Sequence, residues 1–236
     1  MNLLAIDTST PACSVALLVG QAVFARFDMM PARHTEVLIP WVESLLAEAG
    51  IRRFDLDAIG VAIGPGTFTG VRLAISVAQG FAFGLHRPVI PLSTLHLLAL
   101  QAPPYAQNVL ACLDARMGEV YCGCYRRDDS GVLSLMITES VCSPDAFVLP
   151  QTTGSWFALG SGLNVENKLL FQRINDRCIE QRPSAYPNAA DMLPYASQVL
   201  AQGQVVDPAR VEPIYLRQRV AWTLAERRSG AAKKSI

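Results

Sequence analysis

The sequence has few histidines and no arrangement of cysteines that would hold a metal. Only three histidines occur in 236 residues, and none belongs to an HExxH motif. The six cysteines are scattered, without the CxxC pair that is typical of zinc sites and redox centres. We therefore expect no zinc site and no metalloprotease. The cysteines are expected to be reduced and buried, packing as small apolar side chains.

The chain also lacks a net charge. Lys and Arg together number 20, as do Asp and Glu, so no overall field draws the protein to nucleic acid. The C-terminal end is the exception. Residues 210–236 contain seven basic side chains against Glu212 and Glu226, which gives this tail a charge of +5 and leaves −5 on the body. The tail is therefore the part expected to contact a polyanion.

Neither a secretory leader nor a membrane span is evident. The N-terminus has no basic region, and its apolar run is interrupted by Asp7. Residues 73–113 carry one formal charge, Arg87, but prolines divide this stretch and polar residues punctuate it. We expect a buried core here, no association with a membrane, and a cytoplasmic location.

After Pro103 and Pro104 the sequence repeats the pattern of strands and turns with which it begins. Apolar residues make up 51% and charged residues 17%, which excludes a disordered chain. Each half begins with a strand, an Asp-bearing turn and a second strand, and later adds helices. We predict an α/β fold of two related lobes, 1–103 and 104–236, each a mixed sheet flanked by helices, with a cleft between them. A return of the C-terminal segment to the first lobe is left open. The expected strands are 2–6, 13–19, 22–27, 58–63, 88–91, 109–113, 119–126, 132–141 and 156–159, and the expected helices are 35–49, 71–83, 94–101 and 188–202.

The most conspicuous local motif is the glycine-rich segment 64–70, between a strand and a helix. Backbone N–H groups in such a turn could hold an anion. The segment lacks the Gly-Lys-Ser/Thr ending of a P-loop, and Thr69 replaces the third glycine of a dinucleotide fingerprint. Spacing alone favours a tight turn without a ligand. Asp7 and Asp114 could face a metal–phosphate across a cleft, whereas each taken singly is more often a turn-stabilising residue.

The helix expected over 71–83 is apolar nearly all round, with small residues that leave parts of its surface flat. Such a helix is enclosed by its own protein or packs against a partner. We expect it to lie beside the helix over 35–49, and both to carry more apolar surface than one sheet can cover. Paired with two equivalent helices of another chain, they would form a four-helix bundle.

Four segments carry a resemblance to a known family, 7–10, 34–40, 64–72 and 114–121, and two shorter ones, 160–162 and 213–217, add to it. Taken together, these segments resemble the TsaB (YeaZ) family of tRNA threonylcarbamoyladenosine biosynthesis proteins. The match extends over nearly the whole chain. It implies the fold of the actin/Hsp70/sugar-kinase (ASKHA) superfamily, which is RNase H-like and agrees with the two lobes inferred above.

The resemblance implies a role rather than a reaction. In this family the protein is a non-catalytic partner, a pseudoenzyme, that scaffolds or activates its paralogue TsaD. TsaD transfers a threonylcarbamoyl group to N6 of adenosine 37 in tRNA. The ATPase TsaE joins that complex, and TsaC supplies threonylcarbamoyl-adenylate. We accordingly expect a heterodimer with TsaD, contact with tRNA through the complex, and a homodimer when the chain is alone.

The resemblance also sets the expected sites. The catalytic paralogue has a His-x-x-x-His metal pair; here His96 matches the second ligand, but Leu92 stands in the first position. One imidazole cannot replace two, so no catalytic or metal residue is assigned. No cofactor is expected, except ATP or ADP within the complex. The expected partner interface comprises His34, Leu38, Trp41, Leu45, Val71, Ile75, Ala78 and Phe83. The expected vestigial nucleotide cleft comprises Asp7, Thr8, Ser9, Gly64, Gly66, Thr67, Asp114, Gly160 and Gly162.

Two alternatives remain open from the sequence. The first is an ATP-dependent phosphotransferase or ATPase of the same fold, with Asp7 and Asp114 at a Mg²⁺–phosphate site. The second is a peptidase, suggested only by the historical grouping of the family with glycoproteases. The missing HExxH motif argues against the peptidase.

Overall fold

The computed structural model describes residues 1–217, which form two compact units. The first unit consists of Met1–Gln101 and Tyr186–Ile214. The second begins at Ala102, continues to Ala185, and resumes at Tyr215. The first division therefore lies close to Pro103, whereas a segment of about thirty residues near the C-terminus belongs with the first unit.

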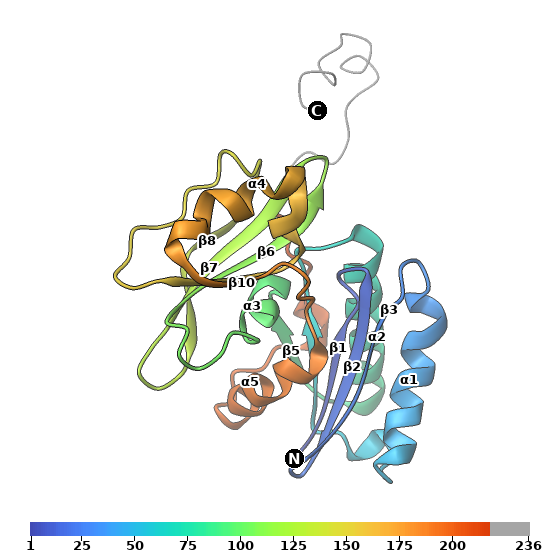
Figure 1. Cartoon of the computed structure of the whole chain (residues 1–236). Coiled ribbons are helices and arrows are strands. Elements are labelled where there is room, and N and C mark those ends of the chain that lie inside the picture. The colour runs from blue at the N-terminus through green and yellow to red at the C-terminus, as the bar shows by residue number, and fades with distance from the viewer. Residues whose placement is uncertain (218–236) are drawn as a thin grey trace, which may run out of the picture. The chain divides into compact units, whose positions relative to one another are not determined.

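The first unit is built on a mixed sheet of five strands in the order β3-β2-β1-β4-β5 (Figure 1). The strands are β1 (Asn2–Asp7), β2 (Ala12–Val19), β3 (Ala22–Met29), β4 (Ala58–Ala62) and β5 (Val89–Leu92). The first three are antiparallel neighbours, while β1, β4 and β5 run parallel. Most residues of β1, β2 and β4 are buried, as is typical of strands covered on both faces.

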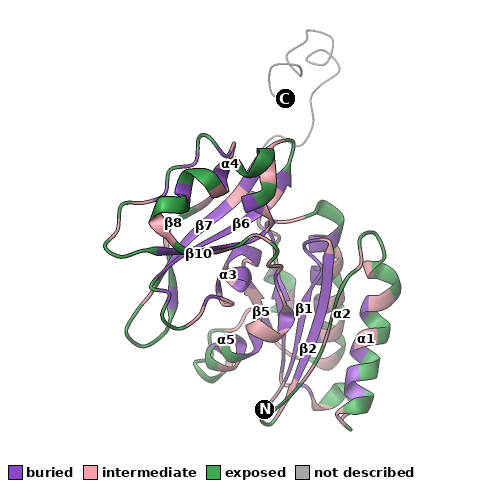
Figure 2. Cartoon of the chain, in the orientation of Figure 1, coloured by how far each residue is buried: buried purple, intermediate pink, exposed green. Residues whose placement is uncertain are grey.

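Helices cover both faces of this sheet. The helices α1 (His34–Glu48) and α2 (Phe68–Leu85) pack on one face, against Leu4 and Ile6 of β1. The alternate β1 residues Leu3 and Ala5 face α5 (Ala189–Ala201) and the short helix α3 (Thr94–Ala99). This division follows from the two-residue period of a strand. Figure 2 shows the contrast between the buried strands and the exposed outer side of α1.

The second unit repeats the arrangement of the first. Its strands are β6 (Asn108–Arg116), β7 (Glu119–Arg127), β8 (Leu133–Cys142), β9 (Trp156–Leu159) and β10 (Cys178–Arg182). Their order is β10-β9-β6-β7-β8; β6, β7 and β8 are antiparallel, and β9 and β10 run parallel to β6. The helix α4 (Val165–Ile174) contributes Leu170 and Ile174 to a core with the fully buried Trp156. The predicted fold class, two mixed sheets flanked by helices, is thus confirmed.

Several local expectations need correction. The helix α2 runs from Phe68 to Leu85 and does not end at Gly84; His86, with φ of 54°, is its left-handed C-cap. The helix α4 and the strand β10 were not expected at all. Cys142 and Cys178 are only half-buried, so the expectation of burial is wrong for these two cysteines.

Within residues 1–217, α2 is the one helix with the length and apolar composition to cross a membrane. Its buried residues, among them Val71, Ala74 and Ala78, belong to the core that covers the first sheet. This packing explains its apolar character without a membrane, because a helix enclosed on a sheet needs an apolar face of the same kind.

Candidate functional site

The glycine-rich loop before α2 lies against the turn that follows β1. The N–H of Thr67 donates to the carbonyl oxygen of Ser9 at 2.7 Å, and the hydroxyl of Thr8 donates to the carbonyl oxygen of Gly70 at 2.6 Å. Thr67 is the N-cap of α2, and its Oγ1 accepts from the N–H of Gly70. The structure therefore brings together the predicted residues of the first unit, joined by direct backbone contacts.

Two glycines of this loop are required by that close approach. A Cβ at Gly66 would lie 2.3 Å from the carbonyl oxygen of Ser9, and a Cβ at Gly70 would lie 2.0 Å from that of Thr8. Neither distance is compatible with a side chain, because the obstructing atoms are backbone. Gly64 has a positive φ of 97° and hydrogen-bonds through its carbonyl oxygen to the N–H of Thr94. The glycines thus serve packing against the β1–β2 turn, which is the interpretation that spacing favours.

Asp7 ends β1 inside this cluster and is fully buried. Its Oδ1 accepts a hydrogen bond from the N–H of Ser9 at 3.0 Å. Burial raises the pKa of Asp7 from 3.8 to about 6, and hydrogen bonds from Ser9 offset part of this rise. Within residues 1–217, no salt bridge involves Asp7. A carboxylate buried in this way is closed to solvent, whereas one that coordinates Mg²⁺ must be open to the metal.

The residues of the second unit that were expected in the nucleotide cleft take part in local structure. The carboxylate of Asp114 is paired with the guanidinium of Arg116 at 3.1 Å and accepts the N–H of Arg116 at 2.7 Å. Gly160 has a φ of 115° where β9 leads into a short 3₁₀ turn. A Cβ at Gly162 would meet backbone atoms of Cys112 and Leu113 at 3.0 Å. Local contacts or backbone geometry therefore give each of these residues a structural role.

The position that matches a metal ligand in the catalytic paralogue is also occupied differently. His96 lies on α3, packs edge-on against the ring of Tyr195 at 5.3 Å, and is half-buried. Burial lowers its pKa to about 4, which keeps the imidazole neutral. In the part of the chain that the structure describes, no group of three or more His, Cys, Asp or Glu side chains is placed to hold a metal ion.

The expected partner interface divides into two sets. Leu38, Leu45, Val71 and Ala78 are at most 2% exposed, and Ile75 is 6% exposed, because all five face the first sheet. The expectation that these five offer surface to a partner is wrong. His34 and Trp41 are half-buried, and Phe83 is 53% exposed, so these three remain accessible.

The outer sides of α1 and α2 instead form an open groove of about 540 Å³. It extends to the 3₁₀ turn η1 (Arg53–Asp55), where Phe54 is 64% exposed. On α1, Ile39 is 50% exposed, and on α2 a Cβ at Gly80 or Gly84 would meet nothing within 4 Å. The groove is lined by Ile39, Glu43, Arg53, Phe54, Ser76, Val77, Gly80, Phe81, Gly84 and Leu85. None of these is among the eight interface residues predicted from the sequence, although Gly80 is one of the small residues expected to leave the surface of this helix flat.

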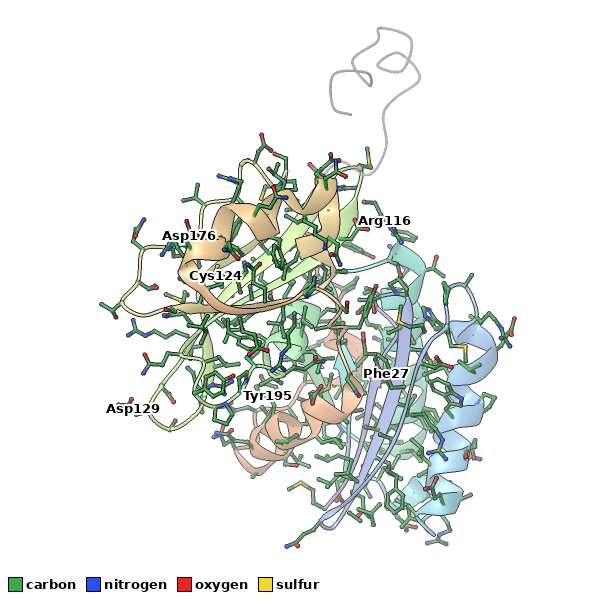
Figure 3. The ribbon with its side chains drawn as sticks, viewed as in Figure 1. Phe27, Arg116, Cys124, Asp129, Asp176 and Tyr195 are labelled. Atoms are coloured by element: carbon green, nitrogen blue, oxygen red, sulfur yellow. The ribbon has the colours of Figure 1, made fainter. Side chains whose placement is uncertain are left out.

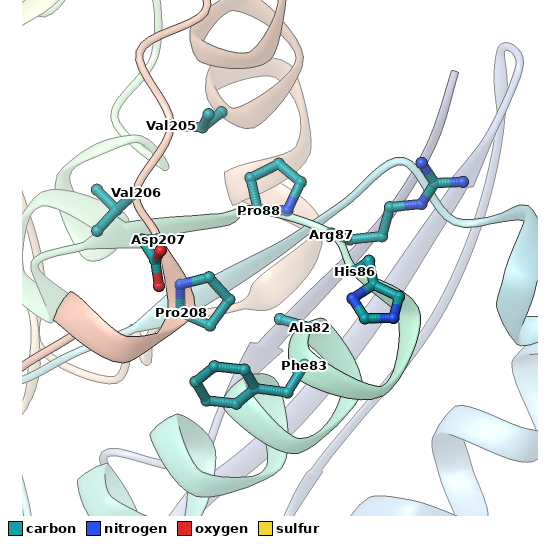
Figure 4. Close-up of a pocket in the computed structure, with 9 residues that line it drawn as sticks. All are labelled: Ala82, Phe83, His86, Arg87, Pro88, Val205, Val206, Asp207 and Pro208. Atoms are coloured by element: carbon teal, nitrogen blue, oxygen red, sulfur yellow. The ribbon is translucent and has the colours of Figure 1, made fainter.

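A second pocket, of about 340 Å³, lies beyond the C-terminal end of α2 (Figure 4). It is formed where the chain turns at His86 and where the segment after α5 returns beside β5. Its acidic residue, Asp207, uses Oδ1 to accept the N–H of Ala209 and so caps the short turn Pro208–Arg210. The carboxylate in this pocket thus has a structural role.

Comparison with known proteins places the chain in a family. The model of the family described as TsaD, tRNA N6-adenosine threonylcarbamoyltransferase, matches residues 29–224. The tRNA threonylcarbamoyladenosine biosynthesis protein TsaB of Escherichia coli K12 is 40% identical over 226 residues, covering 94% of this chain and 97% of the relative.

Solved structures agree. YeaZ from Pseudomonas aeruginosa is 40% identical and superposes with a TM-score of 0.83, covering 91% of this chain and 99% of that one. A second structure is described as an uncharacterised protein with similarity to peptidase YeaZ from the same organism. It is 40% identical and superposes with a TM-score of 0.84, covering 92% of this chain and 99% of that one. The chain therefore belongs to the TsaB (YeaZ) family of tRNA threonylcarbamoyladenosine biosynthesis proteins, within the broader group that the TsaD model describes.

Proposed function

We propose that this chain acts in the formation of threonylcarbamoyladenosine in tRNA as a non-catalytic subunit that binds and supports a TsaD-type transferase. The groove between α1 and α2 carries the proposal. It combines exposed apolar side chains with glycines that permit close approach of a second pair of helices. The family model that matches most of the chain describes the transferase itself, so the proposed partner has helices of the same kind.

The chemistry of the individual residues supports a non-catalytic role. His96 is neutral, half-buried and packed on Tyr195, and Leu92 occupies the position of the missing ligand. Asp7 is buried, and Asp114 is paired with Arg116. A nucleotide, TsaE and tRNA would accordingly be engaged through the assembled complex, and TsaC would act upstream, all in the cytoplasm. In the absence of the transferase, the same apolar groove favours a homodimer.

A charge placed in the groove tests the interface. Ile39→Glu sets a carboxylate at the half-exposed position on α1, in the groove that Phe54 also lines. Because an unpaired charge buried in a contact costs several kcal/mol, we expect the affinity for the transferase to fall about a hundredfold. Threonylcarbamoyladenosine formation by the reconstituted system should fall with it. Both are measured with the transferase from the same organism, by titration and by nucleoside mass spectrometry.

Val148→Glu is the matched control. Val148 is 74% exposed and belongs to the second unit, whereas all residues that line the groove belong to the first. This variant should bind and support modification as the unaltered chain does, with both variants unfolding at the wild-type temperature. Normal binding by folded Ile39→Glu would place the interface elsewhere. Normal modification in a system that omits this chain altogether would refute the proposed function itself.

A further inference from the structure

Five of the six cysteines gather on one face of the second sheet. Cys112 lies on β6, Cys122 and Cys124 on β7, Cys142 at the end of β8, and Cys178 at the start of β10. The first three are buried in the core that contains Trp156, and the last two pack against that core from half-buried positions. Figure 3 marks Cys124 within this sheet. All are free thiols.

Cys122 and Cys142 are neighbours across the β7–β8 pair. Cys142 is opposite Val120 and Cys122 is opposite Ser140, so the two cysteines share a face and stand diagonally. Their thiols are close enough for each to shift the pKa of the other. On its other side, Cys122 is directly opposite Cys112 of β6. Cys122 therefore links a half-buried thiol at the sheet edge to a fully buried one inside.

The two thiols of the pair differ in reactivity. Contact with the Cys122 thiol lowers the pKa of Cys142, although desolvation and the carboxylates of Glu119 and Asp145 oppose this effect. The same contact and burial raise the pKa of Cys122. Every other cysteine also has a raised pKa; that of Cys178, the remaining half-buried thiol, is raised to about 11. Because the thiolate is the nucleophile, Cys142 is the cysteine that combines access with reactivity.

We propose that Cys142 and Cys122 are a reversible oxidation site for hydroperoxides, in which Cys142 is the attacking thiol and Cys122 the resolving thiol. The Cys142 thiolate attacks one peroxide oxygen; the O–O bond breaks, the sulfur is oxidised to sulfenic acid, and the other oxygen leaves as water after taking up a proton. The Cys122 sulfur then attacks the Cys142 sulfur, the S–O bond breaks, and a second water leaves with the Cys122 proton. Two thiols and one hydrogen peroxide thus give one disulfide and two waters. A dithiol reductant reverses the step by exchange.

Closing the bond requires movement of β8. Diagonal neighbours in an antiparallel pair have Cα atoms about 7–8 Å apart, whereas a disulfide spans about 4.4–6.8 Å. Among residues 1–217, β8 is the last strand of its sheet and pairs with β7 alone, so its end can shift without breaking a second ladder. The register already shifts beside Cys122, between it and Cys124. A bridge that distorts a sheet edge is readily reduced, which suits a reversible site.

The test oxidises the full-length, fully reduced chain with hydrogen peroxide in slight excess, followed by alkylation of remaining thiols and peptide mass mapping. We expect loss of two of the six thiols and a peptide linking Cys122 to Cys142, both restored by dithiothreitol. Fragmentation must separate Cys122 from Cys124, which share the tryptic peptide 117–126. Cys142→Ser should slow peroxide-dependent thiol loss about tenfold or more, and the matched control Cys178→Ser should leave it unchanged. Cys122→Ser should stop at a Cys142 sulfenic acid that dimedone traps.

Three results would overturn the proposal. One is a Cys112–Cys122 bridge in place of the expected one, since those residues are directly opposed. Another is unchanged thiol content in the wild-type chain after peroxide. The third is a loss of reactivity in Cys178→Ser equal to that in Cys142→Ser. Because the wild-type mapping alone distinguishes the first two, the proposal is tested even if a substitution at the buried Cys122 impairs folding.

Discussion

Asp7 is a carboxylic acid held where its charge is costly. Its pKa is raised to about 6 in the folded chain against 3.8 for the unfolded one, because burial disfavours the ionised form. The folded state therefore binds more protons than the unfolded state between these values. Its contribution to stability is fully present below about pH 4 and is lost as the pH rises through 6. A difference of about two pKa units corresponds to about 3 kcal/mol at neutral pH.

Replacing Asp7 by asparagine should remove this penalty. The amide oxygen of Asp7→Asn can still accept the N–H of Ser9, and the side chain carries no charge at any pH. We expect the free energy of unfolding at pH 8 to rise by up to about 3 kcal/mol. Its decline between about pH 4 and pH 6 should flatten. Urea denaturation at several pH values measures both.

Asp57→Asn serves as the control for this prediction. Asp57 also accepts a backbone N–H, that of Asn2 at 2.7 Å, but it is only half-buried. This variant should keep the wild-type decline in stability across the acid range. An unchanged decline in Asp7→Asn would mean that another group is responsible for it.

At this same scale the sequence predicts the buried faces of the helices better than it predicts the exposed groove. Apolar residues at helical spacing, such as Leu38, Leu45 and Ala78, were correctly recognised as packing positions but were assigned to a partner. Periodicity marks the face that a helix buries, and in a chain with its own sheet that face is covered internally. The outer groove depends on residues outside the apolar stripe, Ile39 and Gly80 among them, and so carries no periodic signal.

At the scale of the element, α2 contains glycines with opposite requirements. Gly70, in its first turn, lies against the carbonyl oxygen of Thr8, whereas Gly80 faces open space. We expect Gly70→Ala to lower the free energy of unfolding by about 1–3 kcal/mol, because the obstructing atom is backbone and cannot rotate away. Thermal or urea unfolding measures the change.

Gly80→Ala in the same helix is the matched substitution. A methyl group there meets nothing within 4 Å, and alanine is favoured over glycine in a helix by about 0.8–1.0 kcal/mol. This variant should therefore be slightly more stable than the unaltered chain. Equal effects of the two substitutions would show that the contact between the loop and the β1–β2 turn does not constrain the helix start.

Two elements of the second unit escaped prediction for identifiable reasons. Only half of the residues of α4 are apolar, and three of the others, Glu166 to Lys168, have left-handed backbone angles that no propensity indicates. The strand β10 is a short edge strand with exposed and half-buried residues and no apolar alternation. By contrast, the caps of α3 and α5 followed from the sequence: Ser93 and Asn188 accept backbone N–H groups as their residue types indicate.

At the scale of the molecule, the chain contains two units with the same strand order, and the segment Tyr186–Ile214 belongs to the first of them. The strand pattern and the break near Pro103 predict the duplication, since both are local in sequence. The return of residues 186–214 is built from long-range contacts instead: the N–H of Ala189 donates to Ser14 Oγ, and the N–H of Ile214 to the carbonyl oxygen of Ile63. Composition and periodicity do not predict such long-range pairings.

The basic tail is expected to contribute to tRNA binding by the assembled complex, a prediction that rests on the proposed function. Arg217, the last described residue, is tied to the second unit through Glu119 and the carbonyl oxygen of Arg116; the rest of the tail lies outside the described residues. A truncation should therefore remove residues 218–236 and keep Arg217.

Residues 218–236 carry five basic side chains and Glu226, which is the main positive excess in a chain without net charge. We expect the assembled complex to bind tRNA more weakly, with the slope of log affinity against log salt reduced by about 0.7–0.9 for each phosphate that the tail had neutralised. Exchanging the five basic residues for glutamine at full length separates charge from length. Binding curves at several salt concentrations that superpose with those of the full chain would show that the tail does not touch the phosphates.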